Sequence, residues 1–171
     1  MSTATNVTAQ AVNTIEWLSA SGTTIVVPVY QRQYRWDIGG CEKLLADVRA
    51  VAASNDAHTH FIGSILSSES TAVTTGPDDV AELVLIDGQQ RITTLMLLVA
   101  ALHHTVRADN PVLAAELERV LVRASDPHRT KLRPHRAWAE VFEKVVLEKT
   151  GEHEARDSRF DDNYAFFRSQ I

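Results

Sequence analysis

Cysteine, long apolar runs and export signals are what this sequence has least of. It contains one cysteine, Cys41, in 171 residues, which excludes an internal disulfide framework and a cysteine-rich zinc site. We expect Cys41 to belong to the core, because it lies on the apolar side of a predicted helix. The longest apolar run, Leu95–Leu102, is far shorter than the roughly 20 residues of a membrane span. No basic and then apolar stretch opens the chain, so we expect no secretory signal, no membrane partner and a cytoplasmic location.

Two familiar nucleotide-binding signatures are also missing. Neither Gly-x-x-x-x-Gly-Lys-Ser/Thr nor Gly-x-Gly-x-x-Gly occurs, so a P-loop or a Rossmann fold is not supported. Metal-ligand patterns are weak. His58 and His60 have no carboxylate or cysteine at suitable spacing, and His103 and His104 point in different directions on a helix. No Ser/His/Asp or nuclease constellation is visible.

The remaining composition is that of an ordinary globular domain. Hydrophobic residues make up 44% and charged residues 23% of the chain, which excludes wholesale disorder and low-complexity or collagen-like structure. The 17 basic and 22 acidic residues give a net charge of −5. This charge argues against a general basic coat for nucleic acid, but not against a local basic patch. The length suits one domain, or a piece of a longer chain.

The order of helix and strand patterns predicts an α+β fold, with a small sheet and helices packed on it. Asn13 and Glu16 predict a capped short helix, and apolar residues at helical spacing predict another over Cys41–Ala53. Strands are predicted over Ile25–Val27, Phe61–Ser67 and Glu82–Ile86. Gly63 is expected to allow close approach of another backbone, and Ser68–Asp79 to form a hairpin loop.

Four helices are predicted after the last strand. Arg91–Arg107 is apolar along most of its length and is predicted to cross the core. The residues of this helix expected to be buried are Leu95, Leu98, Val99 and Leu102. The later helices are predicted to begin at Asn110-Pro111, at Pro134 and near Tyr164.

These patterns divide the chain into three parts. Residues 1–12 are expected to be loosely ordered, residues 13–108 to form the core, and residues 109–171 to form a helical extension with a charged linker at Glu152–Asp157. The last helical pattern is still apolar at Ile171, so we expect the natural chain to continue beyond it.

The best candidate site is Ile86–Thr94, between a predicted strand and a buried helix. A helix N-terminus presents free N–H groups and a positive dipole end, which suits phosphate. Gly88 allows a tight turn close to a ligand, and Arg91 offers a planar fork for phosphate oxygens. Asp87 can hold Mg²⁺ or orient a water molecule.

The other polar residues of this segment add hydrogen-bonding groups. Gln89 and Gln90 can read a base or position an attacking water, and Thr93 and Thr94 offer hydroxyls. The alternative interpretation is an Asp-Gly turn followed by threonines that cap a helix. Spacing alone leaves that alternative open.

A second candidate is Pro28–Trp36, which is polar, aromatic and basic at once. Its rings can stack on bases, its arginines can contact phosphates and its amides can form hydrogen bonds. In an extended segment, alternate residues face opposite sides. One side would then hold Tyr30, Arg32, Tyr34 and Trp36, and the other Gln31, Gln33 and Arg35. An edge strand with aromatics on the core and solvated arginines is the open alternative.

A third candidate is the basic segment Arg123–Arg136. Five basic residues against Asp126 alone give a local charge of +4. A patch that contacts a nucleic-acid backbone is one interpretation, and a solvated junction between helices is the other.

Three segments, in this order, resemble the signatures of the GmrSD-type N-terminal domain family. They are Val27–Trp36, Phe61–Ile65 and Ile86–Thr94. Asn163–Phe167 also resembles the helical continuation of this family. The resemblance extends from roughly Ile15 to the end of the chain, and the ordered combination is specific although each motif alone is not.

The resemblance implies a ParB/sulfiredoxin-like α+β core with a helical extension. The Asp-Gly-Gln-Gln-Arg motif of this core supports binding and hydrolysis of a nucleoside triphosphate, with GTP favoured and Mg²⁺ held by Asp87. The implied catalytic residues are Asp87, Gln89, Gln90 and Arg91. The implied nucleotide-binding residues are Gly88, Thr93 and Thr94.

The resemblance also implies a DNA partner and a role in bacterial anti-phage defence and modification-dependent restriction. The member that this sequence resembles most senses phosphorothioate-modified double-stranded DNA and couples GTP hydrolysis to a C-terminal HNH-type nuclease domain, which these residues lack. The residues expected to bind the modified DNA are Pro28, Tyr30, Gln31, Arg32 and Arg35. The alternative is a reader of other modified bases, such as glucosylated ones, with a structural Asp-Gly-Gln-Gln-Arg loop. The nucleotide base, the modification and oligomerisation are left open.

Overall fold

A computed structural model describes residues 8–20, 22–54, 61–69, 81–149 and 158–171. Several sequence predictions fall outside this part of the chain: the first residues of the N-terminus, the pair His58 and His60, most of the hairpin loop, and the linker Glu152–Asp157. The described residues form an α+β fold, as the sequence predicts.

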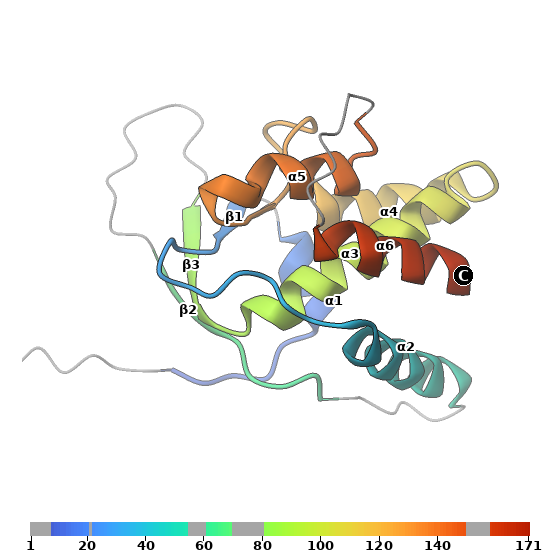
Figure 1. The fold of residues 1–171 in the computed structure, drawn as a ribbon, viewed down its shortest axis with the longest axis horizontal. Coiled ribbons are helices and arrows are strands. Elements are labelled where there is room, and N and C mark those ends of the chain that lie inside the picture. Colours follow the sequence, from blue (N-terminus) through green and yellow to red (C-terminus); the bar gives the residue numbers. More distant parts are fainter. Residues whose placement is uncertain (1–7, 21, 55–60, 70–80, 150–157) are drawn as a thin grey trace, which may run out of the picture.

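One mixed sheet of four short strands forms the β part of the fold (Figure 1). Its strands are β1 (Thr23–Val26), β2 (Leu66–Glu69), β3 (Ala81–Asp87) and β4 (Leu132–Arg133), in the spatial order β2-β3-β1-β4. β1 pairs in parallel with both β3 and β4, and β2 pairs antiparallel with β3. The antiparallel pair confirms the predicted hairpin between the second and third strands.

One strand prediction needs correction, and one strand was not predicted. Phe61–Ile65, predicted as a strand, has no regular structure, and β2 begins only at Leu66. The reason lies at Gly63, whose φ of +103° does not fit a strand. β4 was not predicted, because two residues are too few to show an alternating pattern.

The first two helices begin at side-chain caps. α1 (Thr14–Ser19) starts after Asn13, whose side-chain oxygen accepts hydrogen bonds from the backbone N–H groups of Ile15 and Glu16 at 3.0 and 3.2 Å. α2 (Ile38–Ala53) starts after Asp37, whose carboxylate accepts from the Gly40 N–H at 3.0 Å. Both caps satisfy donors that a helix N-terminus otherwise leaves free.

The helix α3 (Gln89–Val106) is the centre of the core. Twelve of its 18 residues are buried, which agrees with a helix that is apolar on most sides. Leu95, Leu98 and Val99 are buried as predicted, and Leu102 is half-buried against the core cluster. The helix begins two residues earlier than predicted, directly after Gly88.

Three further helices surround α3. They are α4 (Pro111–Leu121), α5 (Arg136–Val146) and α6 (Arg159–Gln170), and all three pack against α3. In Figure 1, α6 lies across α3 and ends at the C-terminus. α6 begins five residues before the predicted start near Tyr164, because the polar first turn around buried Phe160 hides the apolar pattern.

Cys41 belongs to the core, as expected. Its side chain is fully buried in α2. Burial raises the pKa of the Cys41 thiol to about 11, so the thiolate form that reactive cysteines need is disfavoured.

Candidate functional site

The three segments that resemble the family signatures meet at the N-terminal end of α3. They are Val27–Trp36, Phe61–Ile65 and Ile86–Thr94. The irregular segment 27–37 crosses this end of the helix (Figure 1). A cleft of about 410 Å³ lies there, between Gln31–Trp36 and Asp87–Arg91. We call it the motif cleft. Its volume is within the range of about 300–1,000 Å³ that is common for small-molecule sites.

The two motif glutamines hold the main chain of the neighbouring segment. Gln89 Nε2 donates to the Arg32 carbonyl at 3.0 Å, and Gln90 Nε2 donates to the Gln33 carbonyl at 3.1 Å. Gln90 Oε1 also accepts from the backbone N–H of Arg35 at 2.9 Å. These amide groups therefore shape the wall of the motif cleft, and the sequence showed no sign of this use.

The side chain of Gln31 reaches from the neighbouring segment to strand β3. Its Nε2 donates to the carbonyls of Ile86 and Leu85, at 2.7 and 3.4 Å. Tyr30 next to it is 73% exposed. Gln31 was predicted to contact DNA, but its amide donor is engaged within the protein.

Tyr34 does not lie on the same side as Tyr30, so the alternation of an extended segment is wrong here. The Tyr34 hydroxyl accepts from Asn163 Nδ2 at 2.8 Å and is 2.7 Å from Thr94 Oγ1. Thr94 Oγ1 in turn donates to the Gln90 carbonyl at 2.8 Å. Because the threonine proton goes to that carbonyl, Tyr34 must donate to Thr94. Burial raises the pKa of Tyr34 well above its usual range, so the hydroxyl keeps its proton.

Thr93 and Thr94 lie inside the fold rather than on the motif cleft. Thr94 is fully buried and Thr93 is 5% exposed, and the Thr94 hydroxyl has partners on both sides. The structure thus places these two predicted nucleotide ligands behind the cleft wall, where Thr94 supports Tyr34.

Gly88 makes the turn from β3 into α3. Its φ is +91°, and a Cβ there would lie 3.1 Å from Ile65 Cγ1 and 3.3 Å from Ile65 Cα. Glycine adopts this backbone conformation without strain and leaves room for Ile65. The Gly88 N–H donates to Asp87 Oδ1 at 2.7 Å, which fixes the exposed carboxylate at the mouth of the cleft. Gly88 offers no side-chain cap, so no capping side chain occupies the first N–H groups of α3.

Arg91 is positioned by the third motif segment. Its Nη1 donates to the Ser64 carbonyl at 2.5 Å. A Cβ at Gly63 would lie 2.5 Å from the same nitrogen, so a larger residue there would force the guanidinium to move. Gly63 was predicted to admit a backbone, and instead it admits this side chain.

The charges on the motif cleft are mainly positive. Arg32, Arg35 and Arg91 line it, together with one carboxylate, Asp87. Within the described part of the chain, none of these three arginines forms an ion pair. Unpaired guanidinium groups beside a helix N-terminus favour a bound anion.

The donor set suits a metal ion only in combination with a ligand. Among the described residues, no group of three histidine, cysteine or acidic side chains lies close enough to hold a metal. Mg²⁺ is commonly bound by one or two carboxylates together with substrate phosphates and water. Asp87 fits such a site, with the remaining ligands coming from phosphate oxygens and water.

The basic segment Arg123–Arg136 is not a free basic patch. Lys131 is 2% exposed, and its Nζ donates to three backbone carbonyls, those of Leu18, Ala20 and Arg119, at 2.7, 2.8 and 3.2 Å. Burial lowers the pKa of Lys131. This ammonium group ties α1 to the strand β4.

Three arginines of this segment are also engaged. Arg129 pairs with Glu143 at 3.2 Å, and Arg133 pairs with Glu82 at 2.7 Å. Arg123 Nε donates to the Thr130 carbonyl at 3.2 Å. These contacts favour the structural interpretation of the segment over a DNA-contacting patch.

Fold and cleft together define an α+β domain in which two separate segments line one polar, positively charged cleft and a third holds Arg91 in place. The GmrSD restriction endonuclease N-terminal domain family matches residues 14–171, and the chain belongs to this family. Its membership places the domain in a restriction system that targets DNA and acts with a nuclease domain. No curated protein matches the sequence. No described helix is long and apolar enough to cross a membrane.

Proposed function

We propose that this domain binds a nucleoside triphosphate, with GTP favoured, in the motif cleft and hydrolyses it in response to phosphorothioate-modified DNA. The turnover then controls the nuclease domain of the restriction system. The observation that carries the proposal is the meeting of three arginines, one carboxylate and a helix N-terminus on a single cleft.

The phosphates would lie against α3 and Arg91. Backbone N–H groups at the start of α3 supply donors without any side chain, and the Arg91 fork supplies a charge-assisted contact. Arg91 is held by Ser64, so little side-chain freedom is lost when the anion binds.

Asp87 would hold the metal or orient the attacking water. The Gly88 N–H holds one carboxylate oxygen, which leaves the other toward the cleft. Bound Mg²⁺ would neutralise charge that develops on the phosphate oxygens. Gln89 and Gln90 act indirectly in this proposal, through the main-chain contacts that fix Arg32 and Arg35.

The DNA side of the proposal rests on the exposed residues before the cleft. Val29 and Tyr30 are 71% and 73% exposed and stand beside the exposed Arg32. Sulfur in place of a phosphate oxygen is larger, softer and a weaker acceptor, so apolar and aromatic contacts favour it. Pro28 adds to this surface, and Arg32 and Arg35 can hold neighbouring phosphate oxygens.

A second function is favoured by one specific observation. Both motif glutamines bind main chain, as expected for a structural loop in a reader of modified bases. In that function, the domain binds modified DNA, such as glucosylated DNA, without nucleotide turnover.

Nucleotide turnover separates the two functions. GTP hydrolysis is measured with phosphorothioate DNA and with unmodified DNA, for the wild type and for Asp87→Asn. The asparagine keeps an oxygen for the Gly88 N–H but loses the charge, so we expect turnover to fall by about 100-fold or more. Asp109→Asn removes an exposed carboxylate just after α3 and serves as the control. Absence of turnover in the wild type would leave only the reader function, whereas equal turnover in wild type and Asp87→Asn would show that Asp87 has no part in hydrolysis.

A further inference from the structure

A second pocket lies on the other side of the segment that walls the motif cleft. It has a volume of about 260 Å³ and lies between Gln33–Arg35, Trp138 of α5 and the residues Ser158–Phe160 at the start of α6. Gln33 and Arg35 line both this pocket and the motif cleft. The motifs of the sequence predicted no site here, because Trp138 and Arg159 lie far along the chain from them.

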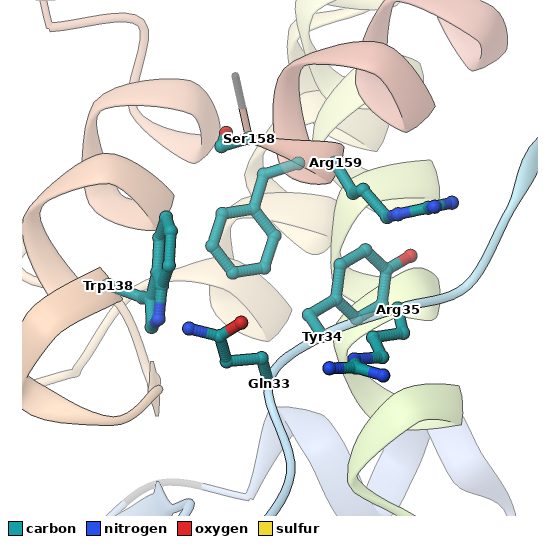
Figure 2. A pocket seen from close by; sticks show the side chains of 7 residues that line it. Gln33, Tyr34, Arg35, Trp138, Ser158 and Arg159 are labelled. Atoms are coloured by element: carbon teal, nitrogen blue, oxygen red, sulfur yellow. The ribbon is translucent and has the colours of Figure 1, made fainter. Parts of the chain in front are cut away.

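The two ends of this pocket differ in chemistry. Figure 2 shows Trp138 on one side, with the Gln33 amide turned toward it, and Arg35 and Arg159 on the opposite side. Within the described residues, neither guanidinium forms an ion pair. One end therefore offers a flat aromatic surface and an amide, and the other offers two positive charges.

The aromatic walls of the pocket are closely packed. The rings of Tyr34 and Phe160 stack at 5.1 Å between centroids, with an interplanar angle of 21°. Trp138 packs edge-to-face against Phe160 at 6.4 Å. Phe160 is 4% exposed, and Asn163 holds Tyr34 through a 2.8 Å hydrogen bond. A binding surface that is already fixed loses little conformational entropy on binding.

We propose that this pocket binds one unpaired nucleotide of a DNA strand, with the base against Trp138 and Gln33 and the phosphate at Arg35 and Arg159. A flat base stacks well on an indole, and its edge can pair with the Gln33 amide. The guanidinium groups match the planar geometry of a phosphate.

DNA is a better source of this nucleotide than free triphosphate. The pocket is smaller than the motif cleft and below the range of about 300–1,000 Å³ of small-molecule sites, so it suits a base and its phosphate rather than a whole nucleoside triphosphate. The chain belongs to a DNA-targeting family. Because Arg35 lines both sites, DNA in this pocket would act on the wall of the motif cleft.

The proposal does not require nucleotide turnover, and its test uses nucleotide-free protein. Binding of a labelled short single strand, its fully paired duplex and a duplex with one unpaired nucleotide is measured by fluorescence anisotropy. We expect the strand and the duplex with the unpaired nucleotide to bind more tightly than the paired duplex. Trp138→Ala is expected to weaken binding of both by roughly 5- to 150-fold, as found for loss of one base–aromatic stack.

Three further variants separate loss of binding from loss of folding. Trp138→Phe keeps a ring in the core and is expected to lose less affinity than Trp138→Ala. Arg159 is exposed, so Arg159→Ala leaves the core intact. This variant is expected to bind the strand more weakly, and the salt dependence of its binding is expected to fall by about one phosphate contact. Arg119→Ala removes an exposed arginine of α4 and is expected to change nothing.

Three outcomes would overturn the proposal. One is unchanged strand binding in both Trp138→Ala and Arg159→Ala. Another is an equal loss for the strand and the paired duplex in Trp138→Ala. The third is that a free deoxynucleoside monophosphate displaces the labelled strand with the same affinity as the unlabelled strand, and that Trp138→Ala weakens both affinities equally. Asp87→Asn, which tests the proposed turnover, is expected to bind the strand normally, so the two proposals fail separately.

Discussion

The side-chain amide of Asn163 in α6 donates to the Tyr34 hydroxyl at 2.8 Å. The same nitrogen donates to the Trp36 carbonyl at 3.0 Å. Asn163 is 1% exposed, so both bonds are shielded from water. The last helix of the chain therefore holds the segment that forms one wall of the motif cleft, although the two are more than a hundred residues apart in sequence.

Asn163→Ala is expected to destabilise the domain by about 1–3 kcal/mol, because the Trp36 carbonyl and the Tyr34 hydroxyl lose a buried donor. Chemical denaturation measures this change. Ser169→Ala is the control, since Ser169 is exposed on the same helix and its hydroxyl donates to the nearby Phe166 carbonyl. Equal stability of the two variants would show that Asn163 does not support the wall.

Gly63→Ala is expected to displace Arg91. The new Cβ would lie 2.5 Å from Arg91 Nη1, at a φ of +103°. We expect a loss of about 1–3 kcal/mol in unfolding free energy, typical of a side chain at a disfavoured backbone conformation, and a weaker triphosphate affinity.

Gly39→Ala is the matched control for this glycine. A Cβ at Gly39 would have only Asp37 Oδ1 within 4 Å, at 3.6 Å, and the residue lies in helix α2. Its replacement is expected to leave stability unchanged or to raise it by up to about 1 kcal/mol. A Gly63→Ala protein as stable as Gly39→Ala would contradict the close packing of Arg91.

Gln90→Ala is expected to loosen the main chain of the cleft wall. The backbone N–H of Arg35 loses its acceptor, so its hydrogen exchange should accelerate by roughly 5-fold or more, as expected for one net hydrogen bond. Amide exchange followed by mass spectrometry or NMR gives the rate. Gln170→Ala removes an exposed amide and should leave Arg35 unaffected. An unchanged exchange rate of the Arg35 N–H in Gln90→Ala would show that Gln90 does not hold the cleft wall.

Stability is expected to fall as the pH is lowered, because of His104. This side chain is buried on α3, 2.8 Å from the Tyr164 hydroxyl and 3.5 Å from Glu148. Burial lowers its pKa to about 4 although Glu148 acts in the opposite direction. The folded state then binds fewer protons than the unfolded state, whose histidine pKa is about 6.5.

The free energy of unfolding therefore decreases as the pH is lowered from about 6.5 to about 4. We expect the unfolding free energy to fall by about 2 kcal/mol from pH 7 to pH 5 on account of His104 alone. His104→Gln should remove this part of the dependence. His128→Gln, at an exposed histidine, should keep it. Denaturation curves at both pH values give the unfolding free energies. An equal change in unfolding free energy between pH 7 and pH 5 for wild type and His104→Gln would contradict the burial effect.

Much of the fold follows from local sequence signals. Asn13 and Pro111 mark the starts of their helices correctly, and the apolar run of α3 places it in the core. Such signals are local because a cap or an apolar stripe is formed by residues a few positions apart. The short strand β4 and the polar first turn of α6 carry no comparable signal.

The candidate site was only partly predictable. The sequence identified the two segments that line the motif cleft and the third that holds Arg91, but not the use of their side chains. Gln90 binds a main chain more than fifty residues away, and Asn163 reaches Tyr34 from the last helix. These partners are set by tertiary structure, and an amide in a sequence does not show what it will bind.

Triphosphate binding at Arg91 decides whether the motif cleft is a nucleotide site. Titration calorimetry with a non-hydrolysable GTP analogue and Mg²⁺ compares wild type, Arg91→Lys and the control Arg119→Ala. We predict saturable binding by wild type and Arg119→Ala. Arg91→Lys keeps the charge but loses the fork, and we predict a loss of about 1.5–3 kcal/mol in binding free energy. Equal affinity of wild type and Arg91→Lys, or no binding by the wild type, would contradict the motif cleft as a nucleotide site.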